Sequence, residues 1–488
     1  MCVFLVMNGN GPQGNSYRVV SRRDFVRAAG ASGLATGLAG CTALGGESGT
    51  NQLQWYADSN ASDAAGDIRQ GLWDAGLSQD ISLEILAGPS DSAARQQQIQ
   101  RWLDANVDTP DLFMMDSGWT IPFIIREQLL NFTKSDVVPD QLVQLIENEY
   151  FEAAVQTAKH PDSGDVYAMP LFPDFPTMLY RRDLIEQAGY DPSGNNWATE
   201  SITWKQFAQA VKDAMNQSDV QYGYTFQASA YEGLSCCDFN EFLSSWGGAY
   251  FGGRENLFGP VGDRPITVNE RPVIDSIRMV RTFMRGQRDQ YALEGYAGNI
   301  SPRAVLSWIE DSSLSPFTGG NAVAHRNWPY AITASEEELG DRLGVMPIPY
   351  AVTEQESQYR NIGGPVASLG GWHVTINPNT NKMDQAVQVL EAMAERSFRF
   401  VLLELIGWLP PQPQLLQTQE ARDTLGPYAE PLRVAGENAI PRPVTVVWPQ
   451  QSTKIAQLVN SAYAGSVAPE QAMKQLQSQL DEIENYNQ

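Results

Sequence analysis

Short apolar runs alternate with helical patterns along the chain after residue 52, and their spacing predicts strands and helices in turn. Residues 53–56 and 81–85 alternate between apolar and polar side chains, as in half-buried strands. Residues 111–115 are apolar after the initial aspartate, as in a buried parallel strand. This succession predicts an α/β fold, in which ligands bind at the carboxyl ends of the strands.

A helix is predicted between the second and third of these strands, because Ile99, Trp102 and Leu103 share one helical face. Asp116 and Trp119 follow the third strand directly. We expect these two side chains at the edge of the sheet where ligands bind.

A last helix is predicted from about Pro469, where Met473, Leu476, Leu480 and Ile483 form one apolar stripe. We expect this stripe to pack on the protein's own core, and binding of a partner is the alternative. The chain has 488 residues. This length is too great for one compact core, so two domains are expected.

A basic and then weakly apolar segment precedes these patterns. Arg22 and Arg23 lie in a Ser-Arg-Arg-Asp-Phe-Val sequence that resembles the twin-arginine export motif, and Leu-Ala-Gly before Cys41 resembles a lipobox. We interpret residues 1–41 as an export signal that ends in a lipid anchor on Cys41. Residues 42–52 are rich in Gly, Ser and Thr and read as a flexible tether. An ordinary N-terminal helix is the alternative.

Acidic residues outnumber basic ones. The chain has 57 Asp and Glu against 33 Lys and Arg, a net charge of -24, and only seven of the basic residues are lysines. Such a composition is typical of halophiles, since carboxylates keep a chain soluble at high salt. Improved solubility in a mesophile is the alternative. No dense basic run follows the N-terminal segment, which argues against a nucleic-acid partner.

Cysteines and histidines are too few for a disulfide framework or a metal site. Cys236 and Cys237 are the only cysteines after the N-terminal segment. Because a bond between neighbours closes a small, strained ring, we predict two buried free thiols. His160, His325 and His373 are scattered and form no metal-binding motif, and His373 is expected to be structural. We therefore expect no metal and no other cofactor.

Several sequence blocks occur in the order found in one family of receptors. The segment 165–189 reads as a strand, a proline-interrupted passage, a second strand and a short helix. The other blocks are 203–207, 231–236, 245–250, 327–330, 344–349, 370–372 and 442–445. Together they resemble the maltose and trehalose type of ABC-transporter extracellular solute-binding proteins, family 1. The acidic composition adds a halophilic archaeon as the expected source.

This resemblance implies an α/β, two-lobe periplasmic-binding-protein-like fold of type II. Each lobe is a mixed sheet flanked by helices, and the ligand cleft lies between the lobes. By comparison with the family, residues 53–171 and 366–417 form the first lobe, and residues 172–365 and 418–488 form the second.

The resemblance also implies a function. The chain would be the substrate-binding component of an ABC importer, anchored by lipid at the extracellular face of the cytoplasmic membrane. It would capture a sugar or short oligosaccharide, similar to maltose or trehalose, by closure of the lobes. It would then deliver the sugar to the membrane permease without catalysis.

Carbohydrates restrict what such a cleft contains, because a sugar offers apolar ring faces and a rim of hydroxyl groups. A receptor needs aromatic rings that stack on the faces and charged groups that bind hydroxyls. By resemblance, the expected ligand-binding residues are Arg95, Asp116, Trp119, Asp174, Tyr231, Glu232, Trp328, Gly371, Trp372 and Arg442. Trp55 or Tyr56 is a further candidate, whereas Trp102 and Trp204 lie on helical faces and are expected in the core.

Other functions are compatible with some of these residues. Asp116 and Asp174 could act as the acid and base of a glycoside hydrolase, although no motif for that chemistry accompanies them. A receptor of the same fold for a polyamine would use the same carboxylates, and one for a phosphoester would need more cationic groups. The identity of the sugar also depends on the turn 57–63, where Asp58 or Asp63 could hold a hydroxyl.

Overall fold

The computed structural model describes residues 52–89 and 92–486, which belong to one compact unit. The export signal around Arg22 and Arg23, the lipid anchor on Cys41 and all but the last residue of the tether lie outside the described residues, so these stay predictions. Among the residues that are described, no helix combines the length and the apolar character needed to cross a bilayer.

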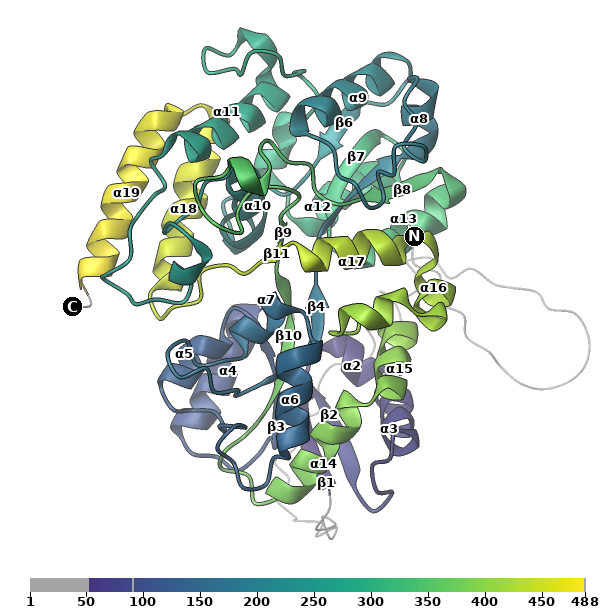
Figure 1. Cartoon of the computed structure of the whole chain (residues 1–488), viewed down its shortest axis with the longest axis vertical. Coiled ribbons are helices and arrows are strands. Elements are labelled where there is room, and N and C mark those ends of the chain that lie inside the picture. Colours follow the sequence, from purple (N-terminus) through teal and green to yellow (C-terminus); the bar gives the residue numbers. More distant parts are fainter. Residues whose placement is uncertain (1–51, 90–91, 487–488) are drawn as a thin grey trace, which may run out of the picture. The chain divides into compact units, whose positions relative to one another are not determined.

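The first sheet has five strands in the order β2-β1-β3-β10-β4 (Figure 1). Their bounds are Gln52–Ala57 (β1), Ser82–Ala87 (β2), Leu112–Asp116 (β3), Met169–Asp174 (β4) and Gly370–Ile376 (β10). β1 pairs in parallel with β2 and β3, and β10 pairs antiparallel with β3 and β4. The three strands predicted from the first apolar runs are confirmed.

The second sheet has four strands in the order β6-β7-β5-β8. Their bounds are Thr177–Arg181 (β5), Tyr222–Thr225 (β6), Ala322–Asn327 (β7) and Leu343–Met346 (β8). β5 is antiparallel to β7 and β8, and β6 is parallel to β7. A separate parallel pair joins β9 (Ala367–Ser368) to β11 (Ala439–Ile440). Both larger sheets are therefore mixed.

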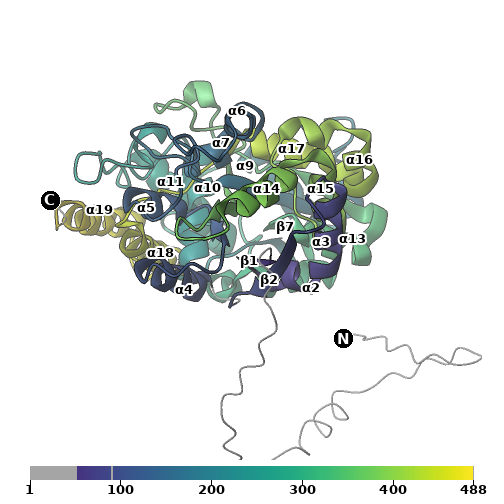
Figure 2. The same ribbon diagram turned by 90° about the horizontal axis from the view of Figure 1, so that it is seen from below.

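Helices flank both sheets. In chain order they are α2 (Ser59–Asp63), α3 (Ala65–Asp74), α4 (Ser92–Asp104), α5 (Thr120–Ile125), α6 (Asp140–Glu149), α7 (Glu152–Thr157), α8 (Arg182–Gln187), α9 (Trp204–Asn216), α10 (Phe239–Ser245), α11 (Arg271–Arg285), α12 (Glu310–Thr318), α13 (Tyr330–Leu339), α14 (Met383–Ala394), α15 (Arg396–Ile406), α16 (Gln419–Leu425), α17 (Ala429–Glu437), α18 (Trp448–Ala464) and α19 (Pro469–Tyr486). Figure 2 shows α3, α14 and α15 side by side, where they pack on one another.

Alternate residues of the first sheet face two separate cores. Leu112 and Met114 of β3 belong to one apolar cluster with Trp55, and Phe113 belongs to a second cluster with Tyr56. All five side chains are buried. Trp55 packs edge to face on Trp408 inside its cluster. It is therefore a core residue and not the ligand contact that the sequence allowed.

The start of α9 follows from a capping box. The Thr203 hydroxyl oxygen accepts a hydrogen bond from the Gln206 amide at 3.2 Å, and the Gln206 side chain accepts one from the Thr203 amide at 3.0 Å. Trp204 and Phe207 then face the core of the second sheet. The prediction that Trp204 is a core residue is confirmed.

The C-terminal helix predicted from Pro469 is α19. Met473, Leu476 and Leu480 are fully buried and belong to the core cluster of the second sheet. α19 packs against α18 and α11 (Figure 1). The stripe therefore packs on the protein's own core, and the alternative of a partner is not needed to explain it.

In the described chain, two segments connect the larger sheets directly. The first runs from β4 to β5, and the second runs from β8 through β9 to β10. β4 continues to Asp174 and belongs to the first sheet. Residues 172–174 therefore lie in the first sheet, whereas the sequence comparison assigned them to the second lobe. Phe175, between β4 and β5, meets Phe151 edge to face at 4.8 Å. The rest of the expected division into lobes stays a prediction.

Candidate functional site

The carboxyl end of β3 continues into a turn held by Asp116. Its Oδ1 accepts a hydrogen bond from the Gly118 amide at 2.7 Å, and its carbonyl accepts one from the Trp119 amide at 2.9 Å. The Ser117 amide donates to the Gly371 carbonyl of β10 at 3.1 Å. The turn is therefore tied to the neighbouring strand and carries Asp116 and Trp119 at the edge of the sheet.

Gly371 occupies a backbone position that other residues adopt only with strain. Its φ is +99°, and a Cβ at this position would lie 2.4 Å from the carbonyl oxygen of Phe172 in β4. A bulge follows between Trp372 and His373. Gly371 therefore allows β10 to approach β4 closely and sets the position of Trp372.

Trp372 and Trp119 form an aromatic pair beside Asp116. Their rings meet edge to face with centroids 5.4 Å apart, and Trp372 lies opposite Asp116 in the pairing of β10 with β3. The guanidinium carbon of Arg95 lies 4.6 Å from the Trp372 ring centroid. Trp119 is buried, whereas Trp372 is only half-buried. Part of the Trp372 ring therefore stays accessible to a ligand.

Arg95 of α4 is buried, yet one of its nitrogen atoms has no partner. Nη2 and Nε donate to the Pro89 carbonyl at 3.1 and 3.4 Å, whereas Nη1 makes no hydrogen bond. Burial lowers the pKa of Arg95, and the nearby Asp58, Tyr56 and Asp116 oppose this effect. Nη1 is therefore an available donor beside the Trp372 ring.

In the turn after β1, Asp58 lies near Arg95, whereas Asp63 is exposed. Asp58 caps α2 by accepting a hydrogen bond from the Ala61 amide at 2.9 Å. Burial raises the pKa of Asp58, which the Ala61 amide and the charge of Arg95 oppose. Asp63 is exposed. Of the two carboxylates that the sequence left open, Asp58 is thus the one beside Arg95.

Arg442, which follows β11, joins two carboxylates from distant parts of the chain. Its Nη1 donates to Oε1 of Glu232 at 3.1 Å, and its Nη2 lies 3.3 Å from Oδ1 of Asp116. Arg442 is buried, Glu232 is half-exposed, and Nε of Arg442 makes no hydrogen bond. Although burial opposes the charge, Asp116 and Glu232 raise the pKa of Arg442 overall.

Asp174 and Trp328 meet at Gly370. Asp174 ends β4 and pairs with Gly370 of β10. A Cβ on Gly370 would lie 2.9 Å from Cζ3 of Trp328 and 3.3 Å from Cβ of Asp174. Burial raises the pKa of Asp174 to about 7, which Arg326 opposes and Asp116 increases. Trp328, at the end of β7, thus packs on the end of the first sheet.

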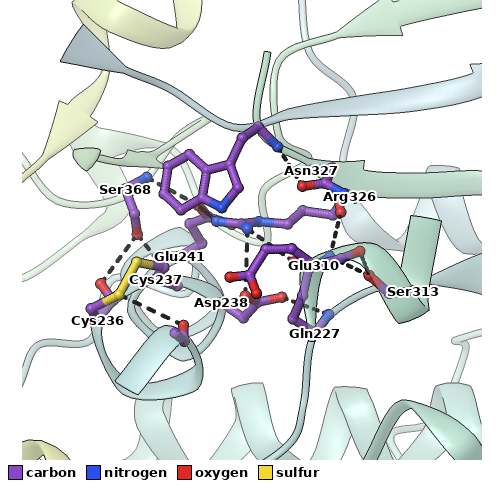
Figure 3. Close-up of polar contacts among 12 residues, drawn as sticks. Gln227, Cys236, Cys237, Asp238, Glu241, Glu310, Ser313, Arg326, Asn327 and Ser368 are labelled. Carbon is purple, nitrogen blue, oxygen red and sulfur yellow. Dashed lines mark hydrogen bonds and ion pairs between the residues drawn. A yellow bond between two sulfur atoms is a disulfide. The ribbon is translucent and has the colours of Figure 1, made fainter. Parts of the chain in front are cut away.

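A buried polar network centred on Arg326 supports Trp328 (Figure 3). Nε and Nη2 of Arg326 donate to the two carboxylate oxygens of Glu241 at 2.8 and 2.5 Å, and Nη1 donates to Gln227 at 3.0 Å. The guanidinium carbon lies 4.8 Å from the Trp328 ring centroid. The Trp328 ring therefore rests on a guanidinium group whose plane is fixed by hydrogen bonds.

The same network contacts the strand that leads into the first sheet. Ser368 of β9 donates its amide to Glu241 at 3.1 Å and its hydroxyl to the Cys237 carbonyl at 3.0 Å (Figure 3). Burial raises the pKa of Asp238, which Arg326 opposes and Glu241 increases. Oδ2 of Asp238 also lies 3.5 Å from Nη1 of Arg326, so the guanidinium group lies between the buried carboxyl groups of Asp238 and Glu241.

Tyr231 lies beside residues that sequence reasoning missed. Its hydroxyl donates to Oε1 of Glu310 at 2.8 Å, and burial together with nearby carboxylates raises its pKa. Tyr330 of α13 is 46% exposed and donates to Asp311 at 3.3 Å. The sequence block 327–330 could have indicated Tyr330 as a site residue, because this aromatic residue lies shortly after the end of a strand. No local signal marks Glu310 or Asp311.

Cys236 and Cys237 form a disulfide, which corrects the prediction of two free thiols. Both residues are buried in a π-helical turn, Leu234–Asp238, that packs against α10, α18 and β9. The prediction weighed only the small ring that the bond closes. It did not include the backbone of this π-helical turn, which local sequence does not reveal.

The structure brings most of the ten predicted ligand-binding residues into two groups. The group around the end of β3 contains Arg95, Asp116, Trp119, Gly371 and Trp372. The group around the Arg326 network contains Asp174, Tyr231 and Trp328. Arg442 contacts Asp116 of the first group and also Glu232.

The histidines have structural surroundings. His325 and His373 are buried and hydrogen-bonded to Thr225 and Thr157, each at 2.8 Å, and burial lowers each pKa to about 3. Both rings are therefore neutral, and the structural role predicted for His373 is confirmed. Within residues 52–89 and 92–486, no group of three His, Cys, Asp or Glu side chains is arranged to hold a metal ion.

Comparison with known proteins points to one family. The family model described as "Bacterial extracellular solute-binding protein" matches residues 68–397. A "Probable ABC transporter-binding protein" of Deinococcus radiodurans is 29% identical over 413 residues, which are 82% of this chain and 86% of that protein.

Solved structures share the arrangement of sheets and helices. Maltose-bound MalE3 of T. maritima has a TM-score of 0.66 and 22% identity, covering 88% of this chain and 98% of that one. UgpB of Mycobacterium tuberculosis in complex with glycerophosphocholine has a TM-score of 0.64 and 16% identity, covering 90% and 100%. These likenesses bear out the predicted type II periplasmic-binding-protein fold, and a fold by itself does not select a ligand.

Proposed function

The chain belongs to the family of bacterial extracellular solute-binding proteins, and from this premise we propose that it captures a sugar or short oligosaccharide for import. It serves as the substrate-binding component of an ABC importer and passes the sugar, similar to maltose or trehalose, to the membrane permease. The sugar is bound and released without chemical change, so the chain is a receptor and not an enzyme.

One observation carries the choice of a sugar: two arginine donors without partners lie in a group that also holds an accessible tryptophan. Nη1 of Arg95 and Nε of Arg442 are unpaired, and Trp372 is half-buried beside Arg95. Sugar hydroxyls accept charge-assisted hydrogen bonds from guanidinium groups, and sugar ring faces stack on indole. Asp116 and Glu232, which Arg442 already contacts, supply acceptors for hydroxyl protons.

Closure over the ligand explains why the proposed ligand-binding residues come from separate parts of the chain. Asp116 lies at the end of β3 in the first sheet, whereas Trp328 lies at the end of β7 in the second. We propose that the two parts close over the sugar and that the closed form docks on the permease. Release then depends on the permease, which moves the two parts away from each other.

The location follows from the N-terminal segment. Export through the motif at Arg22 and Arg23 and a lipid on Cys41 would hold the receptor at the extracellular face of the cytoplasmic membrane. Mass spectrometry of the membrane-extracted protein tests this part, because a diacylglycerol group on an N-terminal Cys41 is expected. An unmodified N-terminus that retains residues 1–40 would contradict it.

The test of function uses maltose, maltotriose and trehalose as probes for the purified chain. A ligand at about a hundred times its dissociation constant adds roughly 2.7 kcal/mol to stability, which raises the midpoint of thermal unfolding. We expect Trp372→Ala to weaken binding of the best probe about ten- to a hundredfold in calorimetry. Trp73→Ala, which removes another half-buried tryptophan in α3, is the control and should leave the affinity unchanged.

The outcomes separate the possible functions. Binding of none of these sugars, or equal affinities in Trp372→Ala and the parent, would contradict the proposal. Conversion of maltotriose, followed by chromatography, would support a glycoside hydrolase. Stabilisation by spermidine or glycerol 3-phosphate alone would keep the fold and change the class of ligand.

A further inference from the structure

A basic pocket lies at the end of α11 and involves none of the residues of the candidate site. Its volume is about 490 Å³, and it is lined by Arg281, Arg285, Arg288, Asp289, Gln290 and Arg303. Four guanidinium groups therefore share this pocket with one carboxylate.

Two of the arginines have structural partners. Arg281 donates to the Asp289 carboxylate at 2.6 and 3.2 Å and to the Ala462 carbonyl at 2.6 Å. Arg285 donates to the Ala464 carbonyl, and its Nε lies 3.7 Å from Asp289. Ala462 and Ala464 end α18, where positive charge is favourable. Asp289 is therefore already used by these two arginines.

The other two arginines have no side-chain partner among the residues that the structure describes. Arg288 and Arg303 are exposed, and neither makes an ion pair or a side-chain hydrogen bond with any residue that the structure describes. Nε of Arg285 is buried and makes no hydrogen bond. Burial and the like charges of Arg281 and Arg303 lower the pKa of Arg285. Positive charge is therefore concentrated in this pocket, where Asp289 is the one carboxylate among the lining residues.

A cluster of arginines with few carboxylates is unexpected in such an acidic chain. With 57 acidic residues against 33 basic ones, an arginine has ample carboxylates with which to pair. Guanidinium groups match the oxygen atoms of phosphate in a bidentate geometry. We propose that the pocket binds an anionic phosphate group, carried by a soluble phosphoester or by a phospholipid headgroup. This inference does not rest on the proposed sugar-binding function.

The test compares matched variants of the purified chain. Inorganic phosphate is titrated at low ionic strength in a buffer free of other phosphate and of sulfate. We expect Arg288→Gln with Arg303→Gln to weaken its binding at least about tenfold, because two charged donors are lost. Arg126→Gln with Arg360→Gln removes two exposed arginines outside the pocket and should leave the affinity unchanged.

A second arm distinguishes the sources of the phosphate. Vesicles of phosphatidylglycerol, with vesicles of phosphatidylcholine as the neutral reference, are sedimented with the chain and with both double variants. Sedimentation only with phosphatidylglycerol, lost in Arg288→Gln with Arg303→Gln alone, assigns the site to a headgroup. Binding of free phosphate without sedimentation assigns it to a soluble phosphoester.

Binding of neither probe, or equal binding in both double variants, overturns the proposal. Binding of maltotriose, measured in parallel, should be the same in all three proteins.

Discussion

Backbone atoms of β4 lie close to Gly371. A Cβ atom on Gly371 would overlap the carbonyl oxygen of Phe172, and the positive φ of Gly371 also disfavours any residue with a side chain. Trp372 is the next residue, so any shift of the strand displaces the ring that the proposed sugar would contact.

We expect Gly371→Ala to lower the free energy of unfolding by about 2 kcal/mol or more, because strain in the backbone is combined with an overlap of atoms. Gly364→Ala is the matched control, since Gly364 also has a positive φ, +73°, but has open space around it. It should cost only about 1 kcal/mol. Urea unfolding measures both values. Equal losses would show that the contact with Phe172 contributes nothing.

Asp174 makes stability depend on pH. Its pKa is about 7 in the folded protein against an ordinary value of 3.8, so the folded chain holds a proton that the unfolded chain releases. The stability from this group is fully present below about pH 3.8 and is lost as the pH rises through about 7. Between these values, the free energy of unfolding should fall less in Asp174→Asn than in the parent. Equal falls in urea unfolding at several pH values would contradict the prediction.

At the scale of elements, Glu241 joins α10 to β7 and β9. Its carboxylate accepts two hydrogen bonds from Arg326 of β7 and one from the Ser368 amide of β9. A single buried carboxylate therefore connects the support of Trp328 with the strand that leads into the first sheet.

Glu241→Gln removes the carboxylate that accepts two hydrogen bonds from Arg326 while keeping an acceptor for the Ser368 amide. Removing one member of a buried ion pair costs about 3 to 5 kcal/mol, and Asp238 remains 3.5 Å from Arg326, so we expect a loss near the lower end of this range in urea unfolding. Glu391→Gln, on the exposed face of α14, should have no measurable effect. The double variant Glu241→Met with Arg326→Met should recover much of the loss. A single variant as stable as the parent would refute the role of this ion pair.

Elements with a local pattern could be predicted from the sequence. The first three strands, the start of α9 and the stripe of α19 depend on neighbours within a few residues. The Arg326 network could not be predicted in this way. Arg326 and Glu241 are 85 positions apart, and Ser368 and Glu241 are 127 apart. Only the folded chain shows that these residues are partners.

At the scale of the whole molecule, the candidate site could be predicted from two signals: Trp372 and Arg442 lie in blocks that resemble a family, and Asp116 directly follows a predicted strand. That resemblance placed Asp116, Trp372 and Arg442 in one list, and the structure brings them together. It gave no information on residues outside the blocks, such as Glu310. It also gave none on the Cys236–Cys237 bond, which lies in a π-helical turn.

The extended segments between the two larger sheets are hydrogen-bonded to one another. Asp174 at the end of β4 pairs with Gly370, and the same stretch of chain pairs with β11 just before, through Ala367 and Ser368. Such a narrow ribbon bends easily out of its plane but resists sliding, because sliding breaks its hydrogen bonds. The closure proposed above would then be a rotation about one axis. Because such a motion has few degrees of freedom to lose, less of the contact energy with the proposed ligand would be spent on ordering the two parts.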